Sequence, residues 1–267
     1  MVQRIVTGVV LIGVLVTALT FGGWFFSIPF MICIGISMFE MFKALKASGA
    51  RLVEWPVYAC FVASIPIMTF KLGSSAALLP LVGAAVMLIA VQVMFRKEPE
   101  LTDILLSALP LTFVLLPGMC MLGLSRAPNA QVELMLKIMA FAIPLAGDTF
   151  AYFIGIIWGR HKLIEPVSPH KTVEGAVGGL FGSILCSFIV WAVFSSAGIM
   201  PFWHALLLGV ICGLSGQAGD LFASLIKRHC GVKDYGSVFP GHGGIMDQLD
   251  SVYWAVVVVY VYLIWFF

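Results

Sequence analysis

Long apolar stretches dominate the chain, and polar residues gather in the short breaks between them. A helix of roughly 20 apolar residues crosses a bilayer core about 30 Å thick. By this criterion the sequence predicts nine spans, near residues 4–22, 24–42, 55–71, 75–95, 103–124, 134–158, 173–197, 203–226 and 249–267. The expected fold class is all-α, a polytopic transmembrane helical bundle of about nine spans.

The N-terminal apolar run has the pattern of a first span rather than of a cleaved signal peptide. Arg4 precedes an apolar stretch from Ile5 to Thr20, and no small-x-small cleavage site with a polar segment follows it. Gly22 and Gly23 lead directly into the next apolar run. We therefore expect an uncleaved first helix joined to the second by a tight hairpin.

Composition supports a membrane protein and excludes some other classes. Of the 267 residues, 61% are hydrophobic and only 10% are charged, whereas soluble domains carry roughly 25% charged residues. Lipid as solvent removes the cost of exposing so much apolar surface. The net charge of +2 is too small to indicate nucleic-acid binding. The six cysteines show no CxxC spacing, so no disulfide framework is expected.

Basic residues are distributed unequally between the two ends of the predicted spans. With the N-terminus in the cytoplasm, twelve of the 15 basic residues fall on the cytoplasmic side and three on the other. The positive-inside rule favours this orientation. The sequence therefore predicts a multi-pass protein of the cell (inner) membrane, with its N-terminus and its active site facing the cytoplasm.

The two halves of the chain differ in polar content. Residues 1–130 have the pattern of transmembrane scaffold helices, in which Glu40, Lys43 and Lys46 are interpreted as a solvated helix end. Residues 131–267 are predicted to form the transmembrane catalytic half, with a polar cavity open to the cytoplasm. In that half Asp148 falls inside a span, and an ionisable group there indicates a functional site because burying it unpaired is costly.

Small residues are concentrated on two helix faces of the second half. They are Gly175, Gly178, Gly179, Gly182 and Ser183 on one, and Gly209, Gly213, Gly216 and Gly219 in part on the other. Such faces are typical of close helix packing in membranes. They are equally compatible with backbones that line a substrate cavity, and both interpretations can hold together.

The segment from Ser168 to Glu174 resembles a helix start. Ser168 is a natural N-cap, and Pro169 is a natural first helical residue. The free N–H groups of such a start attract phosphate. Lys171 and Glu174 would follow on one helix face, at the cytoplasmic mouth of the bundle.

Two further spans carry polar residues at helical spacing. Asp148 and Tyr152 are one turn apart on the same face of their helix. A second helix carries one polar stripe toward its end. It consists of Asp220, Ser224, Lys227 and Arg228.

The stripe continues into a dense polar cassette, Lys227 to Asp250. After Lys233 and Asp234 comes a glycine-rich turn that contains His242, Gly243 and Gly244. Its glycines permit positive φ and close approach of the backbone to an anion. Asp247 and Asp250 follow three residues apart, on one face at the start of the last span.

This inventory of side chains points to phosphate chemistry. Carboxylates without clusters of His or Cys suit Mg²⁺ rather than Zn²⁺, and neighbouring Lys and Arg suit phosphate groups. The sequence therefore favours phosphoryl or nucleotidyl transfer, in which positioning and charge neutralisation do most of the catalysis. His242 is open to two interpretations, a catalytic base or a hydrogen-bonding residue of the loop.

The run from Ser224 to Asp250 resembles the signature of the phosphatidate cytidylyltransferases, also called CDP-diacylglycerol synthases. The match is gapless over about fifteen specified positions, and Gly147 to Gly179 also looks like the middle region of that family. The resemblance implies synthesis of CDP-diacylglycerol and pyrophosphate from CTP and phosphatidate, in phospholipid biosynthesis. It implies Mg²⁺ as cofactor and leaves a second cation such as K⁺ open. The implied partners are CTP, phosphatidate of the cytoplasmic leaflet, membrane lipid and a second copy of the chain, and no nucleic acid.

The resemblance and the polar residues described above together give the candidate site. The catalytic candidates are Asp220, Asp247, Lys227, Arg228 and Lys171. The metal candidates are Asp220 and Asp247, joined by Asp148 and Asp250. The substrate-binding candidates are Ser168, Glu174, Ser224, Lys233, Asp234, His242, Gly243 and Gly244.

Three positions depart from the family pattern and leave alternatives open. His170 stands where relatives usually have Lys, Ala223 where they have Glu, and Gln248 where they have Arg. One alternative is therefore a catalytically altered paralogue that acts on another lipid phosphate. Another is an ion-coupled transporter whose Asp148 and Asp220 carry the ion, but no inverted repeat is evident, and transport does not require a phosphate-binding loop.

Overall fold

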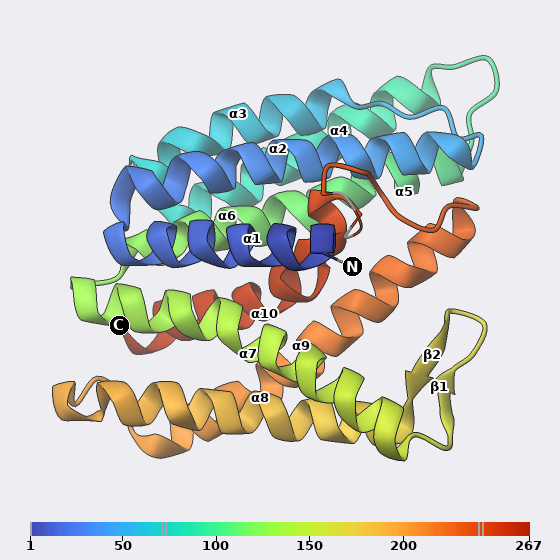
Figure 1. The fold of residues 1–267 in the computed structure, drawn as a ribbon. Helices are drawn as coiled ribbons and strands as arrows, with labels where there is room; N and C mark the ends of the chain where they lie inside the picture. Colours follow the sequence, from blue (N-terminus) through green and yellow to red (C-terminus); the bar gives the residue numbers. More distant parts are fainter. Residues whose placement is uncertain (1, 71, 73, 240, 242) are drawn as a thin grey trace. The chain divides into compact units, whose positions relative to one another are not determined.

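The computed structural model describes residues 2–70, 72, 74–239, 241 and 243–267, and these are almost entirely helical (Figure 1). The helices are α1 (Val2–Phe21), α2 (Gly23–Ala47), α3 (Trp55–Thr69), α4 (Leu78–Met94), α5 (Leu101–Pro110), α6 (Leu116–Gly123), α7 (Ala130–Trp158), α8 (Val173–Phe194), α9 (Phe202–His229) and α10 (Ile245–Phe266). Short 3-10 segments η1 (Ser75–Ala77), η3 (Leu124–Arg126) and η4 (Ser195–Ala197) flank them, and a π-helical turn, η2 (Leu111–Leu115), joins α5 to α6.

Each of the nine predicted spans corresponds to a helical segment in the described part of the chain. Seven segments are long and apolar enough to cross a membrane, and shorter apolar helices cover Val10–Phe21 and Trp55–Thr69. The predicted span near 103–124 is the continuous run Leu101–Arg126. The polytopic helical fold class is therefore confirmed.

The chain divides into two compact units. The first comprises Met1–Arg126 together with Ile226–Gln248, and the second comprises Ala127–Leu225 together with Leu249–Phe267. Most of the polar cassette thus belongs with the helices of the first half. The functional division at about residue 130 stays a prediction.

The first unit begins with the predicted hairpin. Gly22 and Gly23 adopt positive φ angles of 58° and 49°, which side chains disfavour, so α2 starts immediately after α1 ends. Farther along α2, Ile34 is fully buried and packs closely against α6. A Cβ atom at Gly118 would lie only 2.6 Å from Cγ1 of Ile34, which explains why glycine occupies that position.

A buried carboxylate fixes the loop that precedes α3 in the same unit. Asp103 is 3% exposed and accepts hydrogen bonds from Arg51 N at 2.9 Å and from Arg96 Nη1 at 2.8 Å. The hydroxyl of Ser107, one turn later, accepts from Val53 N at 2.9 Å. These bonds pair backbone groups that would otherwise be buried without partners.

Glycines bring α7 and α8 together in the second unit. A Cβ atom at Gly179 would lie 2.9 Å from the carbonyl oxygen of Gly147, and one at Gly175 would lie 2.8 Å from that of Ala151. The predicted small-residue packing is therefore confirmed. Gly175 also lines a cavity, so the two interpretations of these glycines hold together.

The predicted helix start at Ser168 and Pro169 is wrong. Residues Ser168–Thr172 form strand β2, which pairs antiparallel with β1 (Lys162–Ile164). Helix α8 begins at Val173, where the side chain of Thr172 accepts from Gly175 N at 3.1 Å. Ser168 would be extended either as an N-cap or as a strand residue. The pairing with β1 therefore decides the outcome, and Thr172 supplies the cap of α8 instead.

Candidate active site

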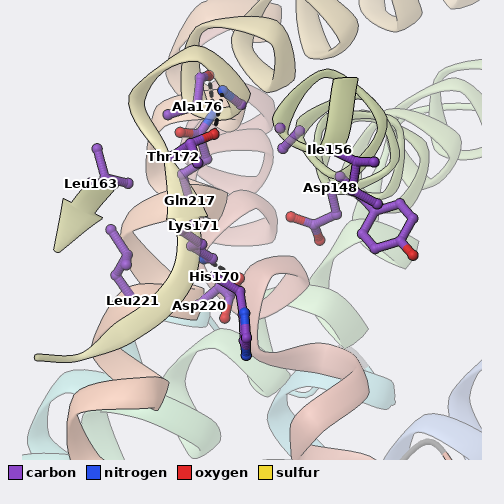
Figure 2. Close-up of a pocket in the computed structure, with 14 residues that line it drawn as sticks. Asp148, Ile156, Leu163, His170, Lys171, Thr172, Ala176, Gln217, Asp220 and Leu221 are labelled. Carbon is purple, nitrogen blue, oxygen red and sulfur yellow. Dashed lines mark hydrogen bonds and ion pairs between the residues drawn. The ribbon is translucent and has the colours of Figure 1, made fainter. Parts of the chain in front are cut away.

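A cavity of about 480 Å³ opens in the second unit (Figure 2). This volume is within the usual range for small-molecule sites, roughly 300–1,000 Å³. Its polar lining comprises Asp148, His170, Lys171, Thr172, Gln217 and Asp220. Its apolar lining includes Tyr152, Ile156, Leu163 and Leu221. Three of the predicted site residues, Asp148, Lys171 and Asp220, therefore line one cavity, and their catalytic and metal-binding roles stay predictions.

An ion pair between Lys171 and Asp220 is the central polar contact of this cavity. Lys171 Nζ donates to Asp220 Oδ2, and Figure 2 shows the two side chains directed toward each other. The side chains are 30% and 25% exposed. The pair is thus shielded enough to strengthen its electrostatics yet open enough to meet a ligand. Ser224 Oγ lies 3.5 Å from the other carboxylate oxygen of Asp220.

Asp148 faces the same cavity from α7. Its Oδ2 accepts a hydrogen bond from Ser251 Oγ of α10 at 2.9 Å, which fixes the orientation of the carboxylate. Tyr152, one turn later, also lines the cavity, as the helical spacing predicts. The cavity therefore presents two carboxylates, Asp148 and Asp220, and one lysine, Lys171, which pairs with Asp220.

These oxygen donors fit a hard divalent cation. Mg²⁺ is commonly held by one or two carboxylates, with substrate phosphates and water completing its coordination. The described residues contain no group of three or more His, Cys, Asp and Glu side chains arranged to hold a metal by themselves. Asp148 and Asp220 therefore suit an ion that arrives with a phosphate ligand, and Lys171 supplies charge that a phosphate would also meet.

The first unit holds a second cluster, centred on Asp247 of α10. Its Oδ1 accepts from Lys227 Nζ at 2.8 Å, and its Oδ2 accepts from Tyr235 N at 2.8 Å and Gly244 N at 3.0 Å. The side chains of Lys227 and Asp247 are only 13% and 8% exposed. Asp247 thus ties the loop between α9 and α10, residues 230–244, to the start of α10, as the acidic member of a capping box does.

The glycine-rich turn in this loop has the predicted backbone. Gly241 and Gly243 adopt φ angles of 81° and 86°, and Phe239 N donates to Gly243 O at 2.9 Å. Gly244 is buried. His242 lies outside the described residues, so both interpretations of it stay predictions.

The other predicted site residues lie in varied settings. Arg228, Lys233 and Asp234 are exposed, at the end of α9 and in the following loop. Asp250 is buried in the second unit, where its Oδ1 accepts from Ser251 N at 2.7 Å. Ser168 is half-buried in β2. Their roles toward substrate and metal stay predictions.

Glu174 has different interaction partners from Lys171. Its carboxylate accepts from the backbone N–H groups of Arg160 and His161, at 3.1 and 3.2 Å, and contacts His161 Nδ1 at 2.6 Å. It is outside the cavity lining. The geometry indicates that Glu174 fastens the base of the β1–β2 hairpin to α8, and its predicted substrate contact stays a prediction.

We therefore expect Glu174→Ala to loosen the hairpin that carries Lys171. Two backbone N–H groups lose their acceptor in this variant, and we expect a fall in activity of about tenfold. Hydrogen exchange across residues 160–172 should accelerate. Glu165→Ala is the matched control, because Glu165 is exposed in the same hairpin. Equal exchange in the two variants would contradict this role.

Glu40 was misassigned by sequence reasoning. It is not a solvated helix end: it is 3% exposed, and its Oε2 accepts from Met246 N at 2.9 Å. A signal was available in the sequence, since Glu40 stands between Phe39 and Met41 and is the sole acid of the segment Gly23–Ala47. An acid within an apolar run indicates a specific partner.

Comparisons with known proteins show the family of this chain. The sequence model of the cytidylyltransferase family matches residues 2–266. The phosphatidate cytidylyltransferase of Synechocystis sp. is 30% identical over 98% of this chain and 96% of its own length. Those of Staphylococcus saprophyticus and Staphylococcus haemolyticus are 46% and 43% identical over 43% of this chain and 43% of their own lengths. Because the match to the family covers nearly the whole sequence, the chain belongs to the cytidylyltransferase family of enzymes.

Proposed function

We propose that this chain is a phosphatidate cytidylyltransferase, which converts CTP and phosphatidate to CDP-diacylglycerol and pyrophosphate. The observation that carries the proposal is the cavity of the second unit, where Lys171 pairs with Asp220 beside Asp148. Membership of the cytidylyltransferase family and the activity for which its relatives are named support this substrate pair.

The proposed reaction is a nucleotidyl transfer without a covalent enzyme intermediate. A phosphate oxygen of phosphatidate forms a bond to the α-phosphorus of CTP, and the bond from that phosphorus to the bridging oxygen of the β-phosphate breaks. Pyrophosphate leaves with that electron pair. Both reactants are anionic, so the protein must neutralise charge and hold the reacting atoms in line.

The residues of the cavity suit that task. Lys171 would neutralise phosphate charge, and Asp148 and Asp220 would hold Mg²⁺. When bound, the ion polarises phosphoryl oxygens and stabilises developing charge. The apolar lining at Ile156 and Leu221 suits the approach of an acyl chain from the lipid phase. We further propose that the cavity faces the cytoplasm of a cell membrane and that the enzyme is a homodimer.

One cavity residue favours the second candidate, a paralogue that acts on another lipid phosphate. His170 is exposed and lines the cavity where the family resemblance places Lys. An imidazole ring is shorter than a lysine side chain and holds its two nitrogen atoms in a rigid plane. It would therefore offer a head group different hydrogen-bonding positions.

The test is synthesis by the purified full chain in detergent, with labelled CTP, phosphatidate and Mg²⁺. Label should enter a lipid-linked CMP and depend on both phosphatidate and the divalent cation. A panel of other lipid phosphates separates the two candidates, since the paralogue would use one of them in preference to phosphatidate. Absence of any labelled lipid across several metals and acyl chains would overturn both.

A further inference from the structure

Glu40 of α2 reaches the glycine-rich loop from a distance of 206 residues in sequence. Its Oε2 accepts from Met246 N, in the first turn of α10, and the N–H of Ile245 also interacts with the carboxylate. The first N–H groups of a helix lack partners within the helix and attract anions. A carboxylate from α2 therefore occupies the anion-binding end of α10, within the first unit.

The loop is shaped around this carboxylate. A Cβ atom at Gly236 would lie 2.6 Å from Cδ of Glu40, and one at Gly244 would lie 2.5 Å from the same atom. Neither glycine has a positive φ angle, so backbone conformation does not require glycine at these positions. What requires it is the space that Glu40 fills.

Glu40 and Asp247 act on the same short stretch. Asp247 accepts from Tyr235 N and Gly244 N, while Glu40 accepts from Met246 N. Two carboxylates thus pair with successive backbone donors around the start of α10. Among the described residues no hydrogen-bond donor reaches Oε1 of Glu40, so its position depends on close packing against the glycines.

We propose that Glu40 is a positioning residue of the enzyme: it caps α10 from α2 and holds the loop that carries the cassette residues in place. The inference rests on the proposed function for its effect on rate, although its effect on the loop is independent of any activity. It assigns a site role to a side chain of the half that the sequence marks as scaffold.

The experiment compares Glu40→Ala and Glu40→Gln in the full chain in detergent. Glu40→Ala should accelerate amide exchange at Tyr235, Gly244 and Met246 and lower kcat by about 10- to 100-fold, as small misplacements do. We expect KM to change less than kcat. Glu40→Gln should restore most of both, because its amide oxygen still accepts from Met246 N.

The packing is tested with a double-mutant cycle. Gly236→Ala should accelerate loop exchange as Glu40→Ala does. In the double variant Gly236→Ala should add no further effect, because Glu40→Ala has already freed the space that the new Cβ atom needs. Gly83→Ala is the matched control, since no atom lies within 4 Å of a Cβ at Gly83 in the same unit. Asp103→Asn controls for loss of a different buried carboxylate of that unit.

The outcomes separate the two proposals. Unchanged loop exchange in Glu40→Ala, or additive effects with Gly236→Ala, would overturn the positioning role. If Glu40→Ala does not fold, Gly236→Ala and Glu40→Gln still provide the comparison. The variants could change the loop exchange as expected while the wild-type chain makes no lipid-linked CMP. That result would overturn the proposed reaction and leave the positioning of the loop intact.

Discussion

Asp220→Asn should abolish cytidylyl transfer while leaving the protein folded. The substitution keeps the size of the side chain but removes the charge that pairs with Lys171 in the cavity. Loss of one preorganised electrostatic group at a reacting centre typically costs about 10²–10³-fold in kcat. Because Asp220 is also a proposed ligand of Mg²⁺, the loss should reach the upper part of that range. Incorporation of labelled CMP into lipid measures it.

The matched control is Glu133→Gln, in the same unit. Glu133 pairs with Lys137 at 2.5 Å on α7, and the Lys137 side chain is 1% exposed. Removing this acid weakens a more deeply buried ion pair, so thermal stability should fall at least as much as in Asp220→Asn. Activity per folded molecule should nevertheless persist, because Glu133 lies outside the cavity lining.

The interaction between Lys171 and Asp220 is then tested as a unit. Groups that act together in catalysis give strongly non-additive losses. The double variant Lys171→Met with Asp220→Asn should therefore be little worse than either single variant. Wild-type activity in Asp220→Asn would show that the cavity of the second unit is not where transfer occurs.

The helices were predictable because the bilayer fixes their length. Apolar runs of about 20 residues locate the spans whatever their neighbours are. Asp148 and Asp220 were predictable for a related reason, since an ionisable residue within such a run needs a partner. Both inferences use only information local to one segment. The structure places Asp148 and Asp220 in the lining of one cavity, and their roles there stay predictions.

The features missed by sequence reasoning depend on contacts between distant segments. Strand β2 exists because it pairs with β1, and a five-residue run that begins with Ser-Pro carries no local sign of that pairing. Glu40 meets its partner at Met246, far along the chain. The same holds for the association of residues 226–248 with the first-half helices. Local patterns therefore located the helices and the ionisable residues within them, but not the partners that distant segments supply.

Asp247→Asn should abolish transfer and also loosen the loop between α9 and α10. The carboxylate of Asp247 accepts from one side chain, Lys227, and from two backbone N–H groups. An asparagine presents one oxygen and one NH₂ group, so at least one of these donors would face another donor. Removing one partner of a buried ion pair costs about 3–5 kcal/mol. Hydrogen exchange at Tyr235 and Gly244 should therefore accelerate together with the loss of labelled product.

A metal role for Asp247 makes a further, separable prediction. Lys227 Nζ donates a hydrogen bond to Oδ1 of Asp247. A cation bound to Oδ1 must therefore share this oxygen with the ammonium group or displace the ammonium group. Lys227→Met would remove the competing charge and open Oδ1. If Asp247 is a ligand, the Mg²⁺ concentration that gives half of the metal-dependent rise in melting temperature should fall in Lys227→Met. The rise itself should shrink in Asp247→Asn, where only Asp148 and Asp220 would still bind the ion.

The alternative outcome has a definite meaning. If Asp247 only anchors the loop, Lys227→Met should lower the melting temperature at every Mg²⁺ concentration without shifting the midpoint of the metal response. Because melting temperature is measured without substrate turnover, the result does not depend on any catalytic role of Lys227. The residue would then share with Glu40 the task of holding the loop, and the carboxylates left to bind the ion in the second unit would be Asp148 and Asp220.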